Sequence, residues 1–301
     1  MRLDGGMETT RSLPAAMVTS MRPRQWVKNL LVFAVPLAAN QLFHLDVFID
    51  TVRAFIAFCL VSSSVYVLND ILDVSADREH PKKRFRAIAA GELPIPLAWG
   101  LALVLVVAGL AVAATSGYPA FLLTLGIYVG SSLAYTLGLK HEPVIELGLI
   151  ALGFVLRAVA GGTATGIPIS PWFLTVAAFG SLFMAAGKRY SEFVSLGDDA
   201  ATMRPALAKY SATYLRFVWT VAAAIMLTGY CLWAFQVAVR TNGSALASWS
   251  AVPFVLAVLR YALDIDRGDA GAPEDIAHAD RALQVLALVW LVMFGLGAAG
   301  I

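Results

Sequence analysis

Long apolar runs, separated by short polar stretches, constrain the fold of this chain more than any other feature of its sequence. A helix needs ~20 mostly apolar residues to cross a bilayer, and about nine runs approach that length. Their approximate limits are residues 29–44, 51–74, 94–115, 118–137, 143–163, 170–188, 212–239, 249–266 and 280–301. Backbone groups in lipid must be satisfied within their own segment, and the alternation typical of membrane barrels is missing. The runs therefore predict an all-α, polytopic bundle of about nine transmembrane helices.

The composition agrees with a membrane protein. Charged residues make up 14% of the chain and hydrophobic residues 59%, whereas about a quarter of the residues in soluble domains are charged. We expect one integral membrane domain over 1–301. Residues 1–20 lack a long apolar core, so we expect a flexible N-terminal segment there and no cleaved signal peptide. No nucleic-acid partner is expected, and the sequence leaves the oligomeric state open, a homo-oligomer included.

The distribution of Lys and Arg predicts an orientation, because cytoplasmic loops of membrane proteins carry an excess of these residues. With a cytoplasmic N-terminus, the outer side keeps only Arg53 and Arg240 among the basic residues after Arg11, and Arg157 falls within a span. The inner side holds Arg22, Arg24, Lys28, Arg78, Lys82, Lys83, Arg84, Arg86, Lys140, Lys188, Arg189, Arg204, Lys209, Arg216, Arg260, Arg267 and Arg281. We expect a multi-pass protein of the cell (inner) membrane with its N-terminus in the cytoplasm.

The second apolar run ends in an acidic cluster, within the stretch YVLNDILDVSAD. Asp70, Asp73 and Asp77 are spaced i, i+3, i+7 and are expected on one face of a helix, with Asn69 one turn before Asp73. Like charges on one face repel, so we expect a cation among them. Carboxylate and amide oxygens suit Mg²⁺, which retains waters and bridges to substrate phosphates. The cluster therefore predicts Mg²⁺ as a cofactor, with these four residues as its ligands.

A basic run follows the acidic cluster, and its side chains are suited to binding phosphate. The run holds Arg78, Lys82, Lys83, Arg84 and Arg86. A simpler interpretation is a polar helix end followed by a positive-inside loop. That interpretation explains the basic run but not three clustered aspartates, and ionisable groups gathered at a span are functional by default.

The sixth apolar run ends in a second polar cluster, GKRYSE. Lys188, Arg189, Tyr190 and Glu192 emerge there on the expected cytoplasmic side, as the acidic cluster does. Two such clusters on one side of the membrane favour a single active site. The alternative is a Lys/Arg pair that snorkels at a helix end and is bonded to Glu192.

Other polar residues are weaker candidates. Arg157 lies within an apolar span and must face the bundle, a cavity or an acidic partner. Gln25 and Lys28 precede the first span, where they bind substrate or contact lipid headgroups. Asp264 and Asp266 form either a third polar cap over the site or part of a solvated loop.

Three stretches of the chain resemble one family. NDILDVSAD fits the pattern NDxxDxxxD at the close of a second span, and it is flanked by RPRQWVKNLLVFAVPL and KRFRAIAAGEL. Together they resemble the UbiA-type intramembrane prenyltransferase superfamily. The resemblance covers nearly the whole chain, and it implies a bundle of nine helices and a Mg²⁺-dependent transferase.

The second cluster departs from that superfamily, whose members usually carry another aspartate-rich motif there. GKRYSE, with SATYLRFVWT, RYALDID and EDIA, is similar to the decaprenyl-phosphate phosphoribosyltransferase branch. Members of that branch transfer 5-phosphoribose from 5-phosphoribosyl 1-diphosphate to a polyprenyl phosphate and release diphosphate. The product leads to the lipid-linked arabinose donor of arabinogalactan in certain cell walls.

The residues and the resemblance together imply a role for each candidate. Asp70, Asp73 and Asp77 serve catalysis and, with Asn69, bind Mg²⁺. The donor phosphates are bound by Arg78, Lys83, Arg84, Lys188, Arg189, Tyr190 and Glu192, and the acceptor phosphate by Gln25, Lys28 and Arg157. An alternative is a prenyltransferase with a prenyl diphosphate donor and an aromatic acceptor. An anion transporter is disfavoured, because transporters bind substrate near the bilayer midplane.

Overall fold

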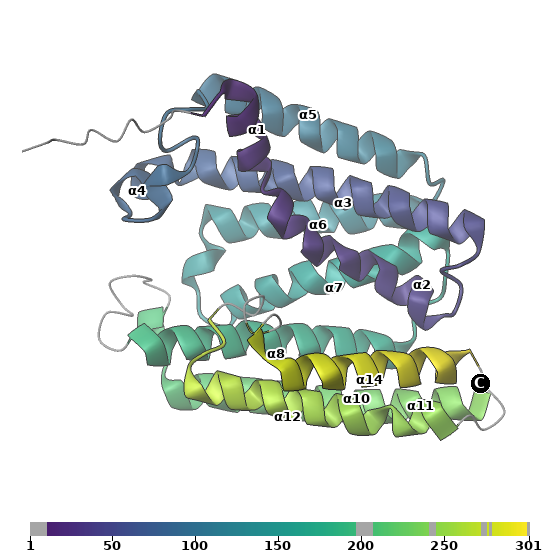
Figure 1. Ribbon diagram of the computed structural model, residues 1–301. Coiled ribbons are helices and arrows are strands. Elements are labelled where there is room, and N and C mark those ends of the chain that lie inside the picture. The colour runs from purple at the N-terminus through teal and green to yellow at the C-terminus, as the bar shows by residue number, and fades with distance from the viewer. Residues whose placement is uncertain (1–10, 197–206, 241–244, 272–275, 277–278, 300–301) are drawn as a thin grey trace, which may run out of the picture.

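The computed structural model describes residues 11–196, 207–240, 245–271, 276 and 279–299. Within these residues the chain forms helices and no strands, which confirms the all-α prediction (Figure 1). The long helices are α3 (Leu45–Leu72), α5 (Ile95–Ala114), α6 (Pro119–Leu137), α7 (Ile145–Thr165), α8 (Pro171–Leu196), α10 (Ala212–Arg240), α12 (Ala251–Arg267) and α14 (Arg281–Ala298). The short ones, with η for a 3₁₀ helix, are α1 (Leu13–Met21), η1 (Pro23–Phe33), α2 (Ala34–Ala38), α4 (Val74–Glu79), η2 (Lys83–Phe85), η3 (Leu139–His141), η5 (Leu207–Lys209) and α11 (Ala245–Trp249).

Seven helical stretches among the described residues are long and apolar enough to cross a membrane. They are α3, α5, α6, α7, α10, α14 and the consecutive pair α11–α12. α8 is a further long helix, of 26 residues, and packs against α7 and α10. The first expected span, 29–44, is divided between η1 and α2, so the expected count of nine is approximate.

Local signals in the sequence set several helix ends. Pro119 opens α6, where its missing N–H would have no partner in any case. Asp280 caps α14, because its carboxylate accepts the backbone N–H groups of Ala282 and Leu283 at 2.9 and 3.1 Å. Gly268 closes α12 at a φ of 84°, in the left-handed region that glycine enters without strain.

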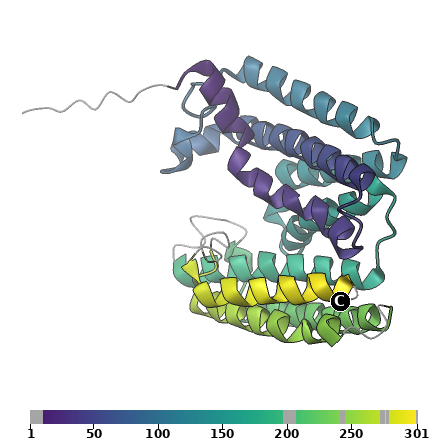
Figure 2. The ribbon, with the colours of Figure 1, turned by 45° about the vertical axis from the view of Figure 1, so that its right-hand side comes forward.

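The helices pack as two groups that meet along α7 and α8 (Figures 1 and 2). Phe58 and Phe121 lie in the core of the first group, and Phe183 and Leu215 in that of the second. η1 lies directly on α7, since a Cβ at Gly161 would come 2.0 Å from the Val32 carbonyl oxygen. α1 belongs to the first group and buries Ala16, although it falls within the segment expected to be flexible.

One end of the bundle collects the polar side chains. The C-terminal ends of α3, α6, α8 and α12 lie there with the N-terminal ends of α7, α10 and α14 (left in Figure 1). Both clusters singled out in the sequence are therefore at the same end of the molecule. Much of the outer surface is apolar, as on α5 and α14, where Leu103, Val104 and Leu288 are exposed.

Candidate active site

The acidic cluster spans a break between two helices. α3 ends at Leu72, Asp73 has φ −92° and ψ 6°, and α4 begins at Val74. The expectation of one continuous helical face is therefore wrong at Asp73. Its backbone lies in the sparsely populated bridge region between the helices. Asp70 and Asp77 nevertheless come together across the break, whereas Asp73 has a separate partner.

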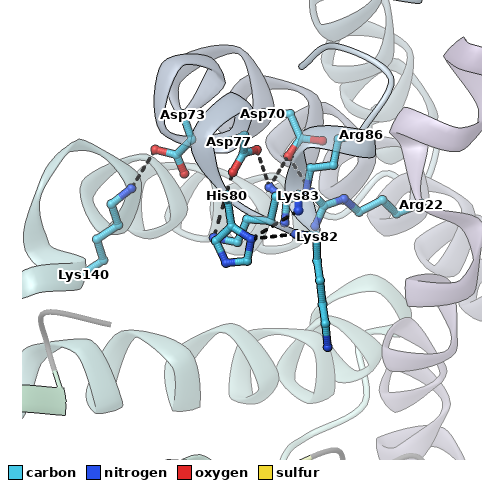
Figure 3. A network of polar contacts seen from close by, with 9 residues as sticks. All are labelled: Arg22, Asp70, Asp73, Asp77, His80, Lys82, Lys83, Arg86 and Lys140. Carbon is cyan, nitrogen blue, oxygen red and sulfur yellow. Dashed lines mark hydrogen bonds and ion pairs between the residues drawn. The ribbon is translucent and has the colours of Figure 1, made fainter. Parts of the chain in front are cut away.

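Asp70 and Asp77 form a buried pair that shares one arginine. Their side chains are only 5% and 3% exposed. Nη1 of Arg86 lies 3.1 Å from Oδ1 of Asp70 and 2.6 Å from Oδ2 of Asp77 (Figure 3). Two buried carboxylates near one another require a positive charge between them, and Arg86 supplies it.

Arg22 adds a second cation to Asp70 from the N-terminal segment. Its Nη2 lies 2.5 Å from Oδ1 of Asp70, and its guanidinium stands 5.0 Å from the centre of the Tyr66 ring. The backbone of Arg22 has a φ of 53°, a left-handed conformation that costs a non-glycine residue ~1–2 kcal/mol. This turn between α1 and η1 brings the side chain back onto α3.

The other two expected metal ligands point elsewhere. Asp73 is bonded to Nζ of Lys140 at 2.9 Å, away from Asp70 and Asp77 (Figure 3). Oδ1 of Asn69 accepts a hydrogen bond from the hydroxyl of Thr136. No group of three or more His, Cys, Asp or Glu side chains is arranged for a metal within the described part of the chain.

The pair Asp70 and Asp77 still suits a hard divalent cation. Mg²⁺ is usually held by only one or two carboxylates, with waters and substrate phosphates completing its shell. A cavity of about 270 Å³ adjoins Asp70, which is the space of several waters at ~30 Å³ each. Its lining includes Ser20, Arg22, Asp70, Lys82, Phe85 and Arg86. Carboxylate and basic side chains around one cavity fit a polyphosphate bound through a metal.

Three of the basic residues expected to bind donor phosphates, Lys83, Arg78 and Arg84, are not part of the lining of this cavity and have different partners. Nζ of Lys83 is 3.9 Å from Asp77, and Nε of Arg78 donates to the Ala89 carbonyl at 3.3 Å. Arg84 stands over the Phe85 ring, 4.8 Å from its centre. The turn that carries them is held by His80, whose Nδ1 accepts the backbone N–H of Lys83 at 3.3 Å.

The second cluster is built around one buried guanidinium. Arg189 is 4% exposed and donates to Glu146, which is 1% exposed, from Nε at 2.8 Å. Its Nη1 donates to Glu192 at 2.8 Å. Arg189 is therefore a partner of Glu192. Lys188 is half-buried and makes no ion pair with a described residue.

Tyr190 joins this cluster to α10 and α12. Its hydroxyl accepts a bond from Arg216 at 2.5 Å and lies 3.4 Å from Asp266, which also binds Arg216 at 2.9 Å. Asp266 thus lies at the polar end of the bundle, on α12 and not in a loop. Asp264 is buried instead, beside a larger cavity of about 450 Å³. None of the residues of the acidic cluster lines that cavity. The smaller cavity, which Asp70 lines, is therefore the better candidate for the active site.

The segment between α6 and α7 joins the two clusters. It carries Lys140, which pairs with Asp73, and leads into the first turn of α7, where Glu146 pairs with Arg189. Val144 in between has a φ of 68°, which is a strained conformation for a β-branched residue. The backbone N–H of Val144 donates to the hydroxyl of Tyr210 at 2.8 Å. Burial raises the pKa of that hydroxyl, so it stays neutral and able to accept.

Arg157 lies in the apolar interior and is bonded to neutral groups. Its Nε donates to Oδ1 of Asn29 at 2.7 Å and its Nη2 to the Tyr128 hydroxyl at 3.0 Å. Its guanidinium and Nζ of Lys28 both approach the Phe154 ring, at 5.8 and 5.9 Å from its centre. Arg157 therefore faces the bundle, as expected, and none of the described carboxylates forms an ion pair with it.

Comparison with known proteins decides the family. The model of the UbiA prenyltransferase family matches residues 30–283. The chain belongs to this family. Its fold also matches a UbiA homologue from Archaeoglobus fulgidus solved with GPP and Mg²⁺. That match has a TM-score of 0.70 and 18% identity, and covers 95% of this chain and 99% of the homologue.

Sequence relatives are more specific than the family as a whole. A decaprenyl-phosphate phosphoribosyltransferase from Corynebacterium glutamicum is 49% identical, over 93% of this chain and 86% of the relative. One from Mycobacterium tuberculosis is 48% identical, over 96% of each chain. This UbiA-family chain therefore resembles decaprenyl-phosphate phosphoribosyltransferases along nearly its full length. The resemblance includes the region of the second cluster.

Sequence reasoning missed two residues of the site and undervalued two more. Glu146 was passed over because one acidic residue at the start of an apolar run carries no motif. Lys140 served only as evidence for orientation. Arg22 and Arg86 were two basic residues among many, and no local pattern distinguishes them. Their carboxylate partners lie 48 and 16 residues away in the chain.

Proposed function

We propose that this protein transfers 5-phosphoribose from 5-phosphoribosyl 1-diphosphate to a polyprenyl phosphate, with release of diphosphate. The observation that carries the proposal is the identity of 48–49%, over 93% or more of the chain, to decaprenyl-phosphate phosphoribosyltransferases. The geometry is compatible with it. A donor that carries a diphosphate and a separate 5-phosphate suits a site with a metal-binding carboxylate pair and further cations.

The donor diphosphate is assigned to the cavity that Asp70 lines, close to the pair Asp70 and Asp77. These aspartates hold Mg²⁺ in the proposal, and Mg²⁺ when bound neutralises the charge that develops on the leaving diphosphate. Mg²⁺ in the homologous Archaeoglobus structure supports this assignment. Arg86 lines this cavity and Nζ of Lys83 lies 3.9 Å from Asp77, and both residues bind the diphosphate oxygens in the proposal. Lys188, half-buried in the second cluster, binds the 5-phosphate.

The reaction requires positioning more than acid–base chemistry. An oxygen of the acceptor phosphate forms a bond to the anomeric carbon of the ribose. The bond from that carbon to the diphosphate oxygen breaks, and its electron pair leaves with the diphosphate. The acceptor phosphate is already ionised at neutral pH, because its second pKa is ~6, so it needs no general base. Asp73 lies at the edge of the site and can stabilise the positive charge that develops on the sugar.

The acceptor is assigned to the side of the site formed by η1 and α7. Lys28 and Gln25 on η1 bind its phosphate, while the polyprenyl tail lies against the apolar outer surface. Arg157 has three of its nitrogens engaged by Asn29, Gly153 and Tyr128. We therefore assign Arg157 the role of fixing η1 on α7 beside the acceptor, in place of direct phosphate binding.

The site opens to the cytoplasm in this proposal, since the Lys/Arg bias favours that orientation and the donor is water-soluble. The test is a cysteine at the exposed position Ala76, in the α4 segment beside the cluster. An impermeant thiol reagent should label it in inverted membrane vesicles and not in intact cells. Labelling in intact cells contradicts the orientation.

The function is tested with purified protein in lipid nanodiscs and every combination of two donors and two acceptors. The donors are 5-phosphoribosyl 1-diphosphate and geranyl diphosphate, and the acceptors are decaprenyl phosphate and 4-hydroxybenzoate. Mass spectrometry should detect phosphoribosylated lipid only with the first donor and the first acceptor, and EDTA should abolish it. A prenylated aromatic product would support the ordinary prenyltransferase reaction instead.

A further inference from the structure

One nitrogen of Arg86 occupies the place between Asp70 and Asp77. It is within 3.1 Å of an oxygen from each carboxylate (Figure 3). A divalent cation that bridges two carboxylates contacts them still more closely, at ~2.0–2.1 Å for Mg²⁺. The arginine nitrogen and a metal ion that bridges these same two oxygens, Oδ1 of Asp70 and Oδ2 of Asp77, therefore exclude one another. A metal that takes the position between these two oxygens must displace Arg86.

Arg86 can move more easily than Asp70 and Asp77, because it is the most exposed of the three side chains. Asp70 and Asp77 are 5% and 3% exposed and are fixed on α3 and α4, whereas the Arg86 side chain is 30% exposed. Arg86 follows η2 on the short turn between α4 and α5. A long side chain near the surface can turn into water at little cost. Two buried carboxylates without any cation would repel each other strongly.

The cavity beside Arg86 offers its side chain a second position. The cavity of about 270 Å³ that we assign to the donor diphosphate is lined by Arg86 itself, next to Asp70. An arginine that leaves the carboxylates can remain in this cavity, where its planar guanidinium can bind two phosphate oxygens at once.

We propose that Arg86 is a placeholder for the metal: it neutralises Asp70 and Asp77 while no metal is bound, and turns onto the donor diphosphate when the metal takes its place. The exchange keeps the buried carboxylates compensated in both states. It also couples donor binding to metal binding, because the phosphate-binding arginine is released only when the metal arrives. The second half of this inference rests on the proposed function.

Arg22 provides an internal contrast. It contacts Oδ1 of Asp70 only and is also held over the Tyr66 ring. Because it does not lie between the two carboxylates, it competes less directly with a bridging metal. Its removal should therefore change metal affinity less than the removal of Arg86.

The test measures metal binding without any substrate. Mn²⁺ is titrated into protein in nanodiscs, and the free ion is followed by electron paramagnetic resonance. Arg86→Gln should bind Mn²⁺ at least ~10-fold more tightly than the wild type, because a competing unit charge is lost. Arg86→Lys should stay near the wild type, and Arg22→Gln should show a smaller gain. Arg53→Gln is the matched control, since Arg53 pairs with Asp50 at 2.8 Å at the opposite end of α3.

The second measurement is the affinity of Mn²⁺-loaded protein for 5-phosphoribosyl 1-diphosphate. Arg86→Gln should weaken it about tenfold, because a charge-assisted bond to phosphate is lost. Unchanged or weaker Mn²⁺ binding by Arg86→Gln overturns the exchange, as does a larger gain in Arg22→Gln. Unchanged donor affinity overturns the move of Arg86 onto the diphosphate. The Mn²⁺ titration uses no substrate, so its result does not depend on the transfer assay. A failure of the proposed function can therefore be distinguished from a failure of the metal exchange.

Discussion

The two polar clusters have opposite designs. In the first, two buried carboxylates are fixed on helices, and the cations that neutralise them reach in from distant segments and stay partly exposed. In the second, the cation Arg189 is itself buried and is enclosed by the carboxylates Glu146 and Glu192. The difference agrees with the proposal that the first cluster exchanges a cation for a metal. The buried pair of Arg189 and Glu146 in the second cluster instead joins α8 to α7.

The largest effect is expected from breaking the second cluster. Arg189→Ala should lower the free energy of unfolding by ~3–5 kcal/mol, because it leaves Glu146 buried without a partner charge. The loss should appear as a lower melting temperature in detergent. The control is Lys209→Ala, whose partner Glu142 is 3.5 Å away and 55% exposed. An exposed pair of this kind contributes at most ~1 kcal/mol. Equal effects of the two substitutions would remove the distinction between the clusters.

Breaking the first cluster should affect catalysis and leave the fold intact. Asp77→Asn keeps the shape of the side chain and removes its charge. Turnover should fall by ~10²–10³-fold, or about 2.7–4 kcal/mol of transition-state stabilisation. The melting temperature should stay close to that of the wild type. Glu79→Gln, an exposed acidic position on the same helix α4, should retain full turnover. A nearly active Asp77→Asn would show that this carboxylate does not hold the metal.

A substitution next to Arg189 separates binding from structure within the second cluster. Lys188→Ala should raise the Michaelis constant for the donor by roughly 10–100-fold, since a hydrogen bond from a charged group contributes ~1.5–3 kcal/mol. The Michaelis constant for the lipid acceptor and the melting temperature should change little. The comparison is made by steady-state kinetics with each substrate varied in turn. An effect confined to the acceptor would mean that the two substrates are assigned to the wrong sides.

Arg157 extends the comparison to a buried cation with neutral partners. Tyr128→Phe removes one acceptor of its guanidinium and should cost ~1–3 kcal/mol of stability. Specific activity of the folded fraction should be retained, because the proposal gives Arg157 no contact with phosphate. The control is Tyr118→Phe, at an exposed tyrosine immediately before α6. It should change neither the stability nor the specific activity. Loss of activity at an unchanged melting temperature would return Arg157 to the acceptor site.

The fold was largely predictable because lipid imposes a length and a polarity on each helix. Runs such as 51–74 and 94–115 correspond closely to α3 and α5. The first run does not form one continuous helix but is divided between η1 and α2. Hydropathy records that a segment is apolar, but the segment Pro23–Ala38 forms η1 and α2 because it packs against α7 at Gly161 and Arg157. A pattern of apolar residues shows that a segment avoids water, but it does not show where the helix breaks.

The sequence by itself determined the membrane class, the acidic cluster at the end of α3 and the polar cluster at the end of α8. Each depends on neighbouring residues, through hydropathy, helical spacing or a short motif. Only the tertiary structure decided which charges meet. Arg86 lies between Asp70 and Asp77, Lys140 pairs with Asp73, and Glu146 pairs with Arg189. The physical reason is that charge pairing depends on distance in space. The bends at Arg22, Asp73 and Val144 set those distances, and composition and spacing along the chain do not record them.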